Sequence, residues 1–172
     1  MSFSNYYFFF FIVLAIPTHL AADFAPDNCE KTPFLGECTS LLKSAPEADK
    51  KDVQSFAKFA LKTTCSNGVT MQEKISSLLK TTSDEFVKKC LTKCSELYLG
   101  STKKLEESIV AFDSKAYKDV QASLTEAIAG SDDCRVSFKE KVEAEDPLGD
   151  LNFEFNKLCS ISKKLVEMAE TN

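Results

Sequence analysis

Residues 82–112 read TSDEFVKKCLTKCSELYLGSTKKLEESIVAF, and this stretch decides the fold class. Its apolar residues recur every three or four positions over several heptads, which is the period of an amphipathic α-helix. Residues 82–85 have a capping-box pattern, which predicts that the helix begins there. The apolar stripe consists of Val87, Cys90, Leu91, Cys94, Leu97, Tyr98, Leu105, Ile109 and Phe112.

A second long helix is predicted before this one, over about residues 49–80. In its middle, Ser66-Asn67-Gly68 lowers helix stability and could kink or break the helix, and we favour a kinked helix. A hairpin turn at Asn67-Gly68 is disfavoured because the flanking residues do not alternate as strands require. The inward positions are Val53, Phe56, Ala57, Ala60, Leu61, Met71, Ile75, Leu78 and Leu79.

Two more helices are predicted over residues 114–141 and 150–170, joined by a polar loop at 142–149 that we interpret as solvated rather than as a cation site. Four amphipathic helices with short connections favour an all-α, up-down-up-down four-helix bundle over residues 49–172. The inward positions of the last two helices are Val120, Leu124, Ala127, Ile128 and Phe138, then Leu151, Phe155, Leu158, Ile161, Leu165 and Met168.

The N-terminus has the features of a secretory signal peptide at residues 1–22. An apolar run at 6–16 is too short to span a bilayer, and small residues at Ala21 and Ala22 favour cleavage after Ala22. The alternative is a buried element of the mature fold. Residues 23–48 then form a short helical hairpin before the bundle. We expect secretion to the apoplast or cell wall, with the vacuole as an alternative.

Composition excludes several functions. Removing 22 of the 172 residues leaves a mature chain of 150, which keeps the formal charge of −5 and has no basic stripe for nucleic acid or anionic membranes. The single histidine, His19, lies in the predicted leader. The mature protein therefore lacks the commonest general base and zinc ligand, so we expect no catalytic residues, no metal, no cofactor and no enzyme activity.

The mature chain has seven cysteines, and an odd count leaves at least one thiol free. Cys29 and Cys38 can close the hairpin locally. Cys94 and Cys134 lie about equally far from a turn near Asp113, so antiparallel helices would bring them together.

The other three cysteines are predicted to be free. Cys65 and Cys90 lie more than about 10 Å out of register about the turn near residue 82, too far for a disulfide. Only a kink at Asn67-Gly68 would change this for Cys65. Cys90 and Cys159 are interpreted as small core residues, because a Cys90/Cys94 metal pair without histidine is disfavoured.

Three motifs are similar to those of the plant invertase and pectin methylesterase inhibitor family. Residues 29–33 (CEKTP), followed by Cys38 and Leu42, resemble the family's opening, and residues 94–98 (CSELY) with Cys134 and Phe138 resemble its second disulfide region. Cys159 lies where many members keep an unpaired cysteine. The resemblance covers essentially the whole mature chain and implies a disulfide-closed hairpin before a four-helix bundle.

The resemblance also implies stoichiometric, 1:1 inhibition of a cell-wall carbohydrate enzyme. One branch of the family blocks pectin methylesterase by laying bundle helices across the substrate cleft, and the other blocks acid invertases. Residues 114–119 (SKAYKD) lack the Pro-Lys-Phe of the invertase branch and are more similar to the Gly-Asp-Tyr of pectin methylesterase inhibitors. Tyr117 and Lys118 are candidate target contacts; the alternative is a packed tyrosine and a solvated lysine.

A secreted helical carrier of the odorant-binding kind is the rival from another class. Cys65, Cys90, Cys94 and Cys134 match part of its cysteine pattern, but two closely spaced cysteines after Cys134 are missing. That class requires Cys90 to be in a disulfide, which the structure can test.

Overall fold

The structure is a computed structural model that describes residues 24–141 and 145–172, with side chains from residue 27. The predicted signal peptide and its cleavage site lie outside the described residues. The elements are α1 (Phe24–Glu30), α2 (Leu35–Ser44), the 3₁₀ helix η1 (Glu47–Lys50), α3 (Val53–Thr81), α4 (Glu85–Asp113), α5 (Tyr117–Phe138) and α6 (Gly149–Thr171).

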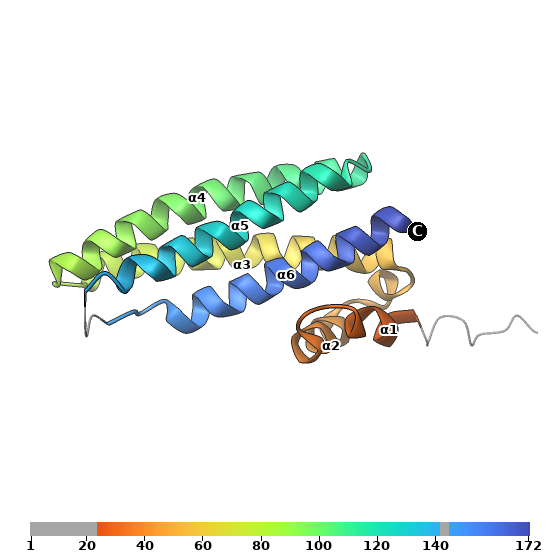
Figure 1. Cartoon of the computed structure of the whole chain (residues 1–172), viewed down its shortest axis with the longest axis horizontal. Coiled ribbons are helices and arrows are strands. Elements are labelled where there is room, and N and C mark those ends of the chain that lie inside the picture. Colours follow the sequence, from red (N-terminus) through yellow and green to blue (C-terminus); the bar gives the residue numbers. More distant parts are fainter. Residues whose placement is uncertain (1–23, 142–144) are drawn as a thin grey trace, which may run out of the picture.

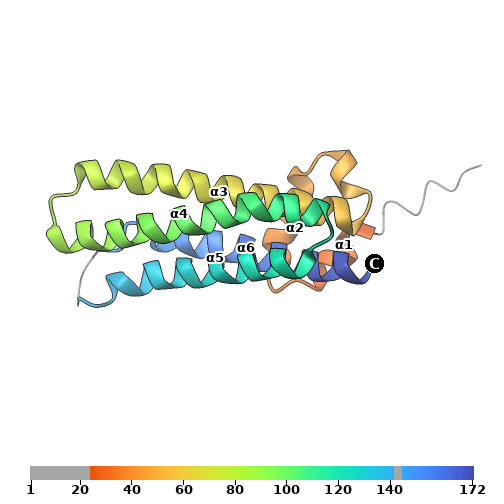
Figure 2. The same cartoon turned by 90° about the horizontal axis from the view of Figure 1, so that it is seen from above.

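Helices α3 to α6 lie side by side, and each runs antiparallel to the one before it (Figures 1 and 2). The short helices α1 and α2 fold back on each other and pack against one end of the bundle, beside the C-terminus (Figure 1). This arrangement confirms the predicted all-α fold, an up-down-up-down bundle preceded by a helical hairpin.

The predicted apolar stripes meet in one continuous core. The largest fully buried side chains come from all four bundle helices and include Phe56, Leu61, Ile75, Leu91, Tyr98, Leu105, Leu124, Phe155, Ile161 and Leu165. The start of α6 differs from the prediction: Leu151 is 41% exposed, whereas Asn152 is 1% exposed. Asn152 takes the inward position because its Oδ1 accepts a hydrogen bond of 2.8 Å from the Tyr98 hydroxyl.

The residue that caps α4 also differs from the prediction. Asp84 is the N-cap, and its Oδ1 accepts hydrogen bonds from the backbone N–H groups of Phe86 and Val87 at 2.8 and 3.0 Å. Thr82 instead closes the C-terminus of α3, where its N–H donates to Leu78 O. An aspartate at this position satisfies two backbone donors that a helix otherwise leaves free.

Helix α3 continues without interruption through Ser66-Asn67-Gly68, so the break considered at this point is absent (Figure 2). Gly68 faces the core, where a Cβ atom would lie 2.8 Å from Thr102 Oγ1 and 3.4 Å from the Phe155 ring. The glycine therefore permits close approach of α3 to α4 and α6, and this packing offsets its low helix propensity.

Candidate functional site

Two disulfides join the cysteines that the sequence analysis paired. Cys29 and Cys38 join α1 to α2 with a Cα–Cα distance of 5.4 Å, and Cys94 and Cys134 join α4 to α5 at 4.8 Å. All four residues are fully buried. The hairpin and the α4–α5 pair are therefore each covalently closed.

Cys65, Cys90 and Cys159 are free and buried. The Cys90 thiol donates to Ser137 O at 3.3 Å, and burial raises the pKa of Cys65 and of Cys159 above the ordinary thiol value. Such thiols are poor nucleophiles because little thiolate forms. No group of three or more histidine, cysteine or acidic side chains that could hold a metal ion occurs within 24–141 and 145–172.

Tyr117 is the first residue of α5, and its ring is half-buried. It packs edge-on against Phe112 of α4, with ring centroids 5.2 Å apart and an interplanar angle of 75°. This is the packed arrangement that the sequence left open as the alternative, and part of the ring remains accessible at the end of the bundle.

Lys118 is an exposed neighbour of this ring, with 77% of its side chain accessible. Its Nζ lies 3.0 Å from Glu170 Oε2, which also accepts from Gln121 Nε2 at 2.8 Å. The hydrogen bonds from Lys118 and Gln121 hold the pKa of Glu170 below its usual value. Lys118 thus links the first turn of α5 to the last turn of α6.

The turn that presents Tyr117 and Lys118 is tight. Lys115 has φ of 59°, in the left-handed region, and the Ala116 N–H donates to Ala111 O at 2.9 Å. Next to it, Lys58 of α3 forms an ion pair with Asp113. The turn is therefore fixed to the end of the bundle by both backbone and side-chain contacts.

A buried polar network lies behind the surface and was not predicted. Asn152 accepts from the Tyr98 hydroxyl and donates from Nδ2 to Cys134 Sγ at 3.4 Å, so that α4, α5 and α6 meet at one point. Burial raises the pKa of Tyr98 far above its ordinary value, so the phenol stays protonated. The sequence signal was available, because Asn152 lies three residues before Phe155 and so on the same face of α6.

A groove of about 340 Å³ between α5 and α6 was also missed; it is lined by Ser131, Asp132, Arg135, Asn152, Phe153 and Asn156. Phe153 on its rim is 54% exposed. Helix geometry could have predicted that Phe153 is exposed, because a residue two positions before the inward Phe155 points to the opposite face of the helix.

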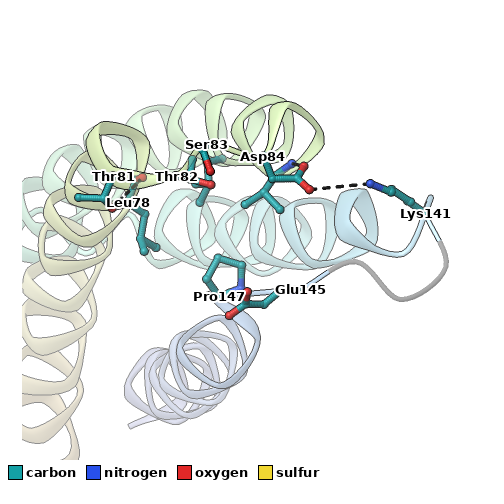
Figure 3. A pocket seen from close by; sticks show the side chains of 10 residues that line it. Leu78, Thr81, Thr82, Ser83, Asp84, Lys141, Glu145 and Pro147 are labelled. Atoms are coloured by element: carbon teal, nitrogen blue, oxygen red, sulfur yellow. Dashed lines mark hydrogen bonds and ion pairs between the residues drawn. The ribbon is translucent and has the colours of Figure 1, made fainter.

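A second cavity, of about 490 Å³, lies at the end of the bundle formed by the α3–α4 turn (Figure 3). Leu78, Thr81 and Asp84 lie on one side of it, and Glu145 and Pro147 on the other. Lys141 Nζ is 3.9 Å from Asp84 Oδ2, so the opposite charges at the rim pair with each other. Asp84 is thus used both in this ion pair and in capping α4.

No helix within the described residues is both long and apolar enough to cross a bilayer.

Comparison with known proteins gives consistent results. A family model described as plant invertase/pectin methylesterase inhibitor matches residues 23–165. A Platanus acerifolia protein named "Putative invertase inhibitor" is 27% identical, covering 98% of this chain and 97% of the relative, and one of the same name from Platanus orientalis is 26% identical over 87% and 91%. Pectinesterase inhibitor 2 of Arabidopsis thaliana is 26% identical over 77% and 76%.

Two solved structures have the same fold. A mutant form of a pectin methylesterase inhibitor from Arabidopsis matches with a TM-score of 0.71 and 22% identity, covering 81% of this chain and 93% of that one. A pectin methylesterase inhibitor from Arabidopsis thaliana matches with a TM-score of 0.63 and 20% identity over 84% and 94%.

Proposed function

The chain belongs to the plant invertase/pectin methylesterase inhibitor family, as its cysteine motifs predicted, and we propose that it is a secreted inhibitor of plant pectin methylesterase. It would act in a 1:1 complex by covering the substrate cleft. The observation that carries this proposal is the family match over residues 23–165, which includes both disulfides and nearly all of the bundle.

A rigid helical surface suits this mode of inhibition. The disulfides and the buried network at Tyr98 and Asn152 order the binding surface before association, so little conformational entropy is lost on binding. We propose further that the protein is not an enzyme, because the chain after residue 22 contains no histidine and its free thiols are buried.

Tyr117 and Lys118 remain our proposed contacts at the α4–α5 turn. The segment that contains them, residues 114–119, is the feature that favours pectin methylesterase as the target. Acid invertase is the second candidate, and it is favoured by the names of the two Platanus relatives, of which the first aligns over nearly its whole length. The helical-carrier alternative is disfavoured, because Cys90 is free where that class needs a disulfide.

For location and boundaries, we propose that residues 1–22 are removed as a signal peptide and that 23–172 form the inhibitor domain, with the hairpin at 23–48 and the bundle at 49–172. Two buried disulfides support an oxidising, extracellular site such as the apoplast. Sequencing the N-terminus of protein secreted from plant cells tests this; a start far from residue 23 would contradict it.

The function is tested by titrating oxidised protein spanning residues 23–172 into a plant pectin methylesterase and, separately, an acid invertase at mildly acidic pH. We expect esterase activity to fall linearly to a 1:1 end point while invertase activity is unchanged. The Cys94→Ser/Cys134→Ser variant, which lacks the bond between α4 and α5, should inhibit less strongly. Loss of invertase activity alone would select the second candidate, and no loss with several isoforms of either enzyme would refute the inhibitor proposal.

A further inference from the structure

The groove between α5 and α6 presents an aromatic side chain held in one orientation. Lys157 Nζ lies 4.4 Å from the Phe153 ring centroid, within the range of a cation–π contact. The same ammonium group pairs with Glu37 at 2.7 Å and Glu154 at 2.9 Å, and only 12% of the Lys157 side chain is exposed. One face of the ring is thus fixed against an immobile cation, while more than half of the residue remains accessible.

The position of Phe153 has no structural explanation within the bundle. The inward side of this turn of α6 is filled by Asn152 and Phe155, which are fully buried. An ordered, exposed aromatic next to a groove and an arginine has the composition of a protein-binding hot spot. Here the arginine is Arg135, which lines the opposite wall of the groove.

The charge around this groove is predominantly negative. Arg135 lies 3.1 Å from Asp132. Burial raises the pKa of Asp146, which also interacts electrostatically with Arg135 and Asp150. Asp132 and Asp146 therefore lie near the Arg135 guanidinium group, and Asp150 lies near Asp146. Val136, which follows Arg135 on α5 and lies one helical turn after Asp132, is half exposed.

We propose that this surface, defined as Asp132, Arg135, Val136, Asp150 and Phe153, docks against the cationic rim of an enzyme cleft that binds a polyanion. The inference rests on the proposed function and deepens it. Positive charge in a cleft favours the binding of a polyuronate, and the carboxylates of this surface complement such charge, whereas a cleft for a neutral disaccharide gains nothing from it. Phe153 inserts as the apolar anchor.

This surface is distinct from the proposed contacts at the α4–α5 turn. Phe153 lies in the first turns of α6, whereas Tyr117 begins α5, and the two helices run antiparallel, so their starts are at opposite ends of the bundle (Figure 1). A target that contacts both would span the length of the helices.

The test compares the Phe153→Ala variant with the unmodified protein, both oxidised, by measuring the dissociation constant of each for a plant pectin methylesterase. We expect binding to weaken about 30-fold, which corresponds to the loss of about 2 kcal/mol that defines a hot spot. The matched control is Leu151→Ala, since Leu151 is also exposed on α6 but points to the opposite side, and it should change binding less than threefold. Circular dichroism of both variants verifies the fold.

The role of negative charge in binding is tested with the double variant Asp132→Asn/Asp150→Asn. Its control is Glu73→Gln/Glu96→Gln, which removes two carboxylates from α3 and α4. Only the first pair should weaken binding and flatten its dependence on salt. If the unmodified protein inhibits neither enzyme, the proposed function has failed. If it inhibits the esterase and Phe153→Ala binds within threefold of it, the Phe153 surface is refuted while the function stands. If Phe153→Ala weakens only invertase binding, the polyanion-binding partner is refuted.

Discussion

Substituting Gly68 by alanine tests the close approach of α3 to its neighbours. In an exposed helix this change stabilises by about 1 kcal/mol because alanine has the higher helix propensity. Here the new Cβ would lie 2.8 Å from Thr102 Oγ1, a short branched side chain that cannot swing away because it is itself buried. Overpacking of this kind costs about 2 kcal/mol. We therefore expect Gly68→Ala to destabilise the protein by about 1 kcal/mol.

The second arm of the experiment removes the obstacle. Thr102 Oγ1 has no hydrogen-bond partner among the described residues, so Thr102→Ala also removes an unsatisfied buried hydroxyl. In the double variant Gly68→Ala/Thr102→Ala the Cβ has room, and we expect it to be at least as stable as the unmodified protein. Gly100→Ala is the control, because a Cβ there meets nothing within 4 Å and should stabilise by about 1 kcal/mol.

The assay is urea unfolding of the oxidised protein followed by circular dichroism, with the free energy of unfolding obtained by linear extrapolation. With a slope of about 2 kcal/mol/M, the Gly68→Ala midpoint should fall by about 0.5 M. If Gly68→Ala is as stabilising as Gly100→Ala, or if Thr102→Ala fails to rescue it, the packing argument for this glycine is wrong.

Three other measurements test features of the site. Tyr98→Phe leaves the buried Asn152 Oδ1 without its donor and should lower the free energy of unfolding by about 1–3 kcal/mol in the same urea assay. Replacing Cys94 and Cys134 by serine reopens a 40-residue loop and should cost roughly 4 kcal/mol, read from the shift of the urea midpoint. The pKa of Glu170 is lowered in the folded state, so its contribution to stability is present above the ordinary carboxylate pKa and is lost as pH falls through the lowered value. Glu170→Gln should therefore reduce the loss of stability that the protein shows between about pH 5 and 3.

The fold follows from local patterns, and the departures have non-local causes. Helical periodicity located all four bundle helices, because each buries one apolar stripe. It placed Leu151 inward and overlooked Asn152, since only contact with Tyr98, 54 residues away in sequence, makes a buried amide favourable. It treated Gly68 as a weak point, because the Thr102 and Phe155 side chains that require a glycine come from other helices.

The candidate site was less accessible to sequence reasoning. Tyr117 and Lys118 were found through a family pattern, and their contacts with Phe112 and Glu170 depend on how α5 packs against α4 and α6. Phe153 could have been recognised from its position two residues before an inward phenylalanine. Its fixed orientation could not, because Lys157 is held there by Glu37 of the hairpin, 120 residues earlier in the chain.

The bond between Cys94 and Cys134 holds α4 and α5 together independently of the peptide backbone between these two residues, which are 40 positions apart in sequence. That interval contains the α4–α5 turn, where Ser114 and Lys115 are exposed to solvent. A single cut there yields two fragments that stay joined by the disulfide. Each fragment keeps its own helix, α4 or α5, packed in the core. A nicked molecule would therefore migrate at its full mass until it is reduced, and it would retain the surfaces on either side of the cut.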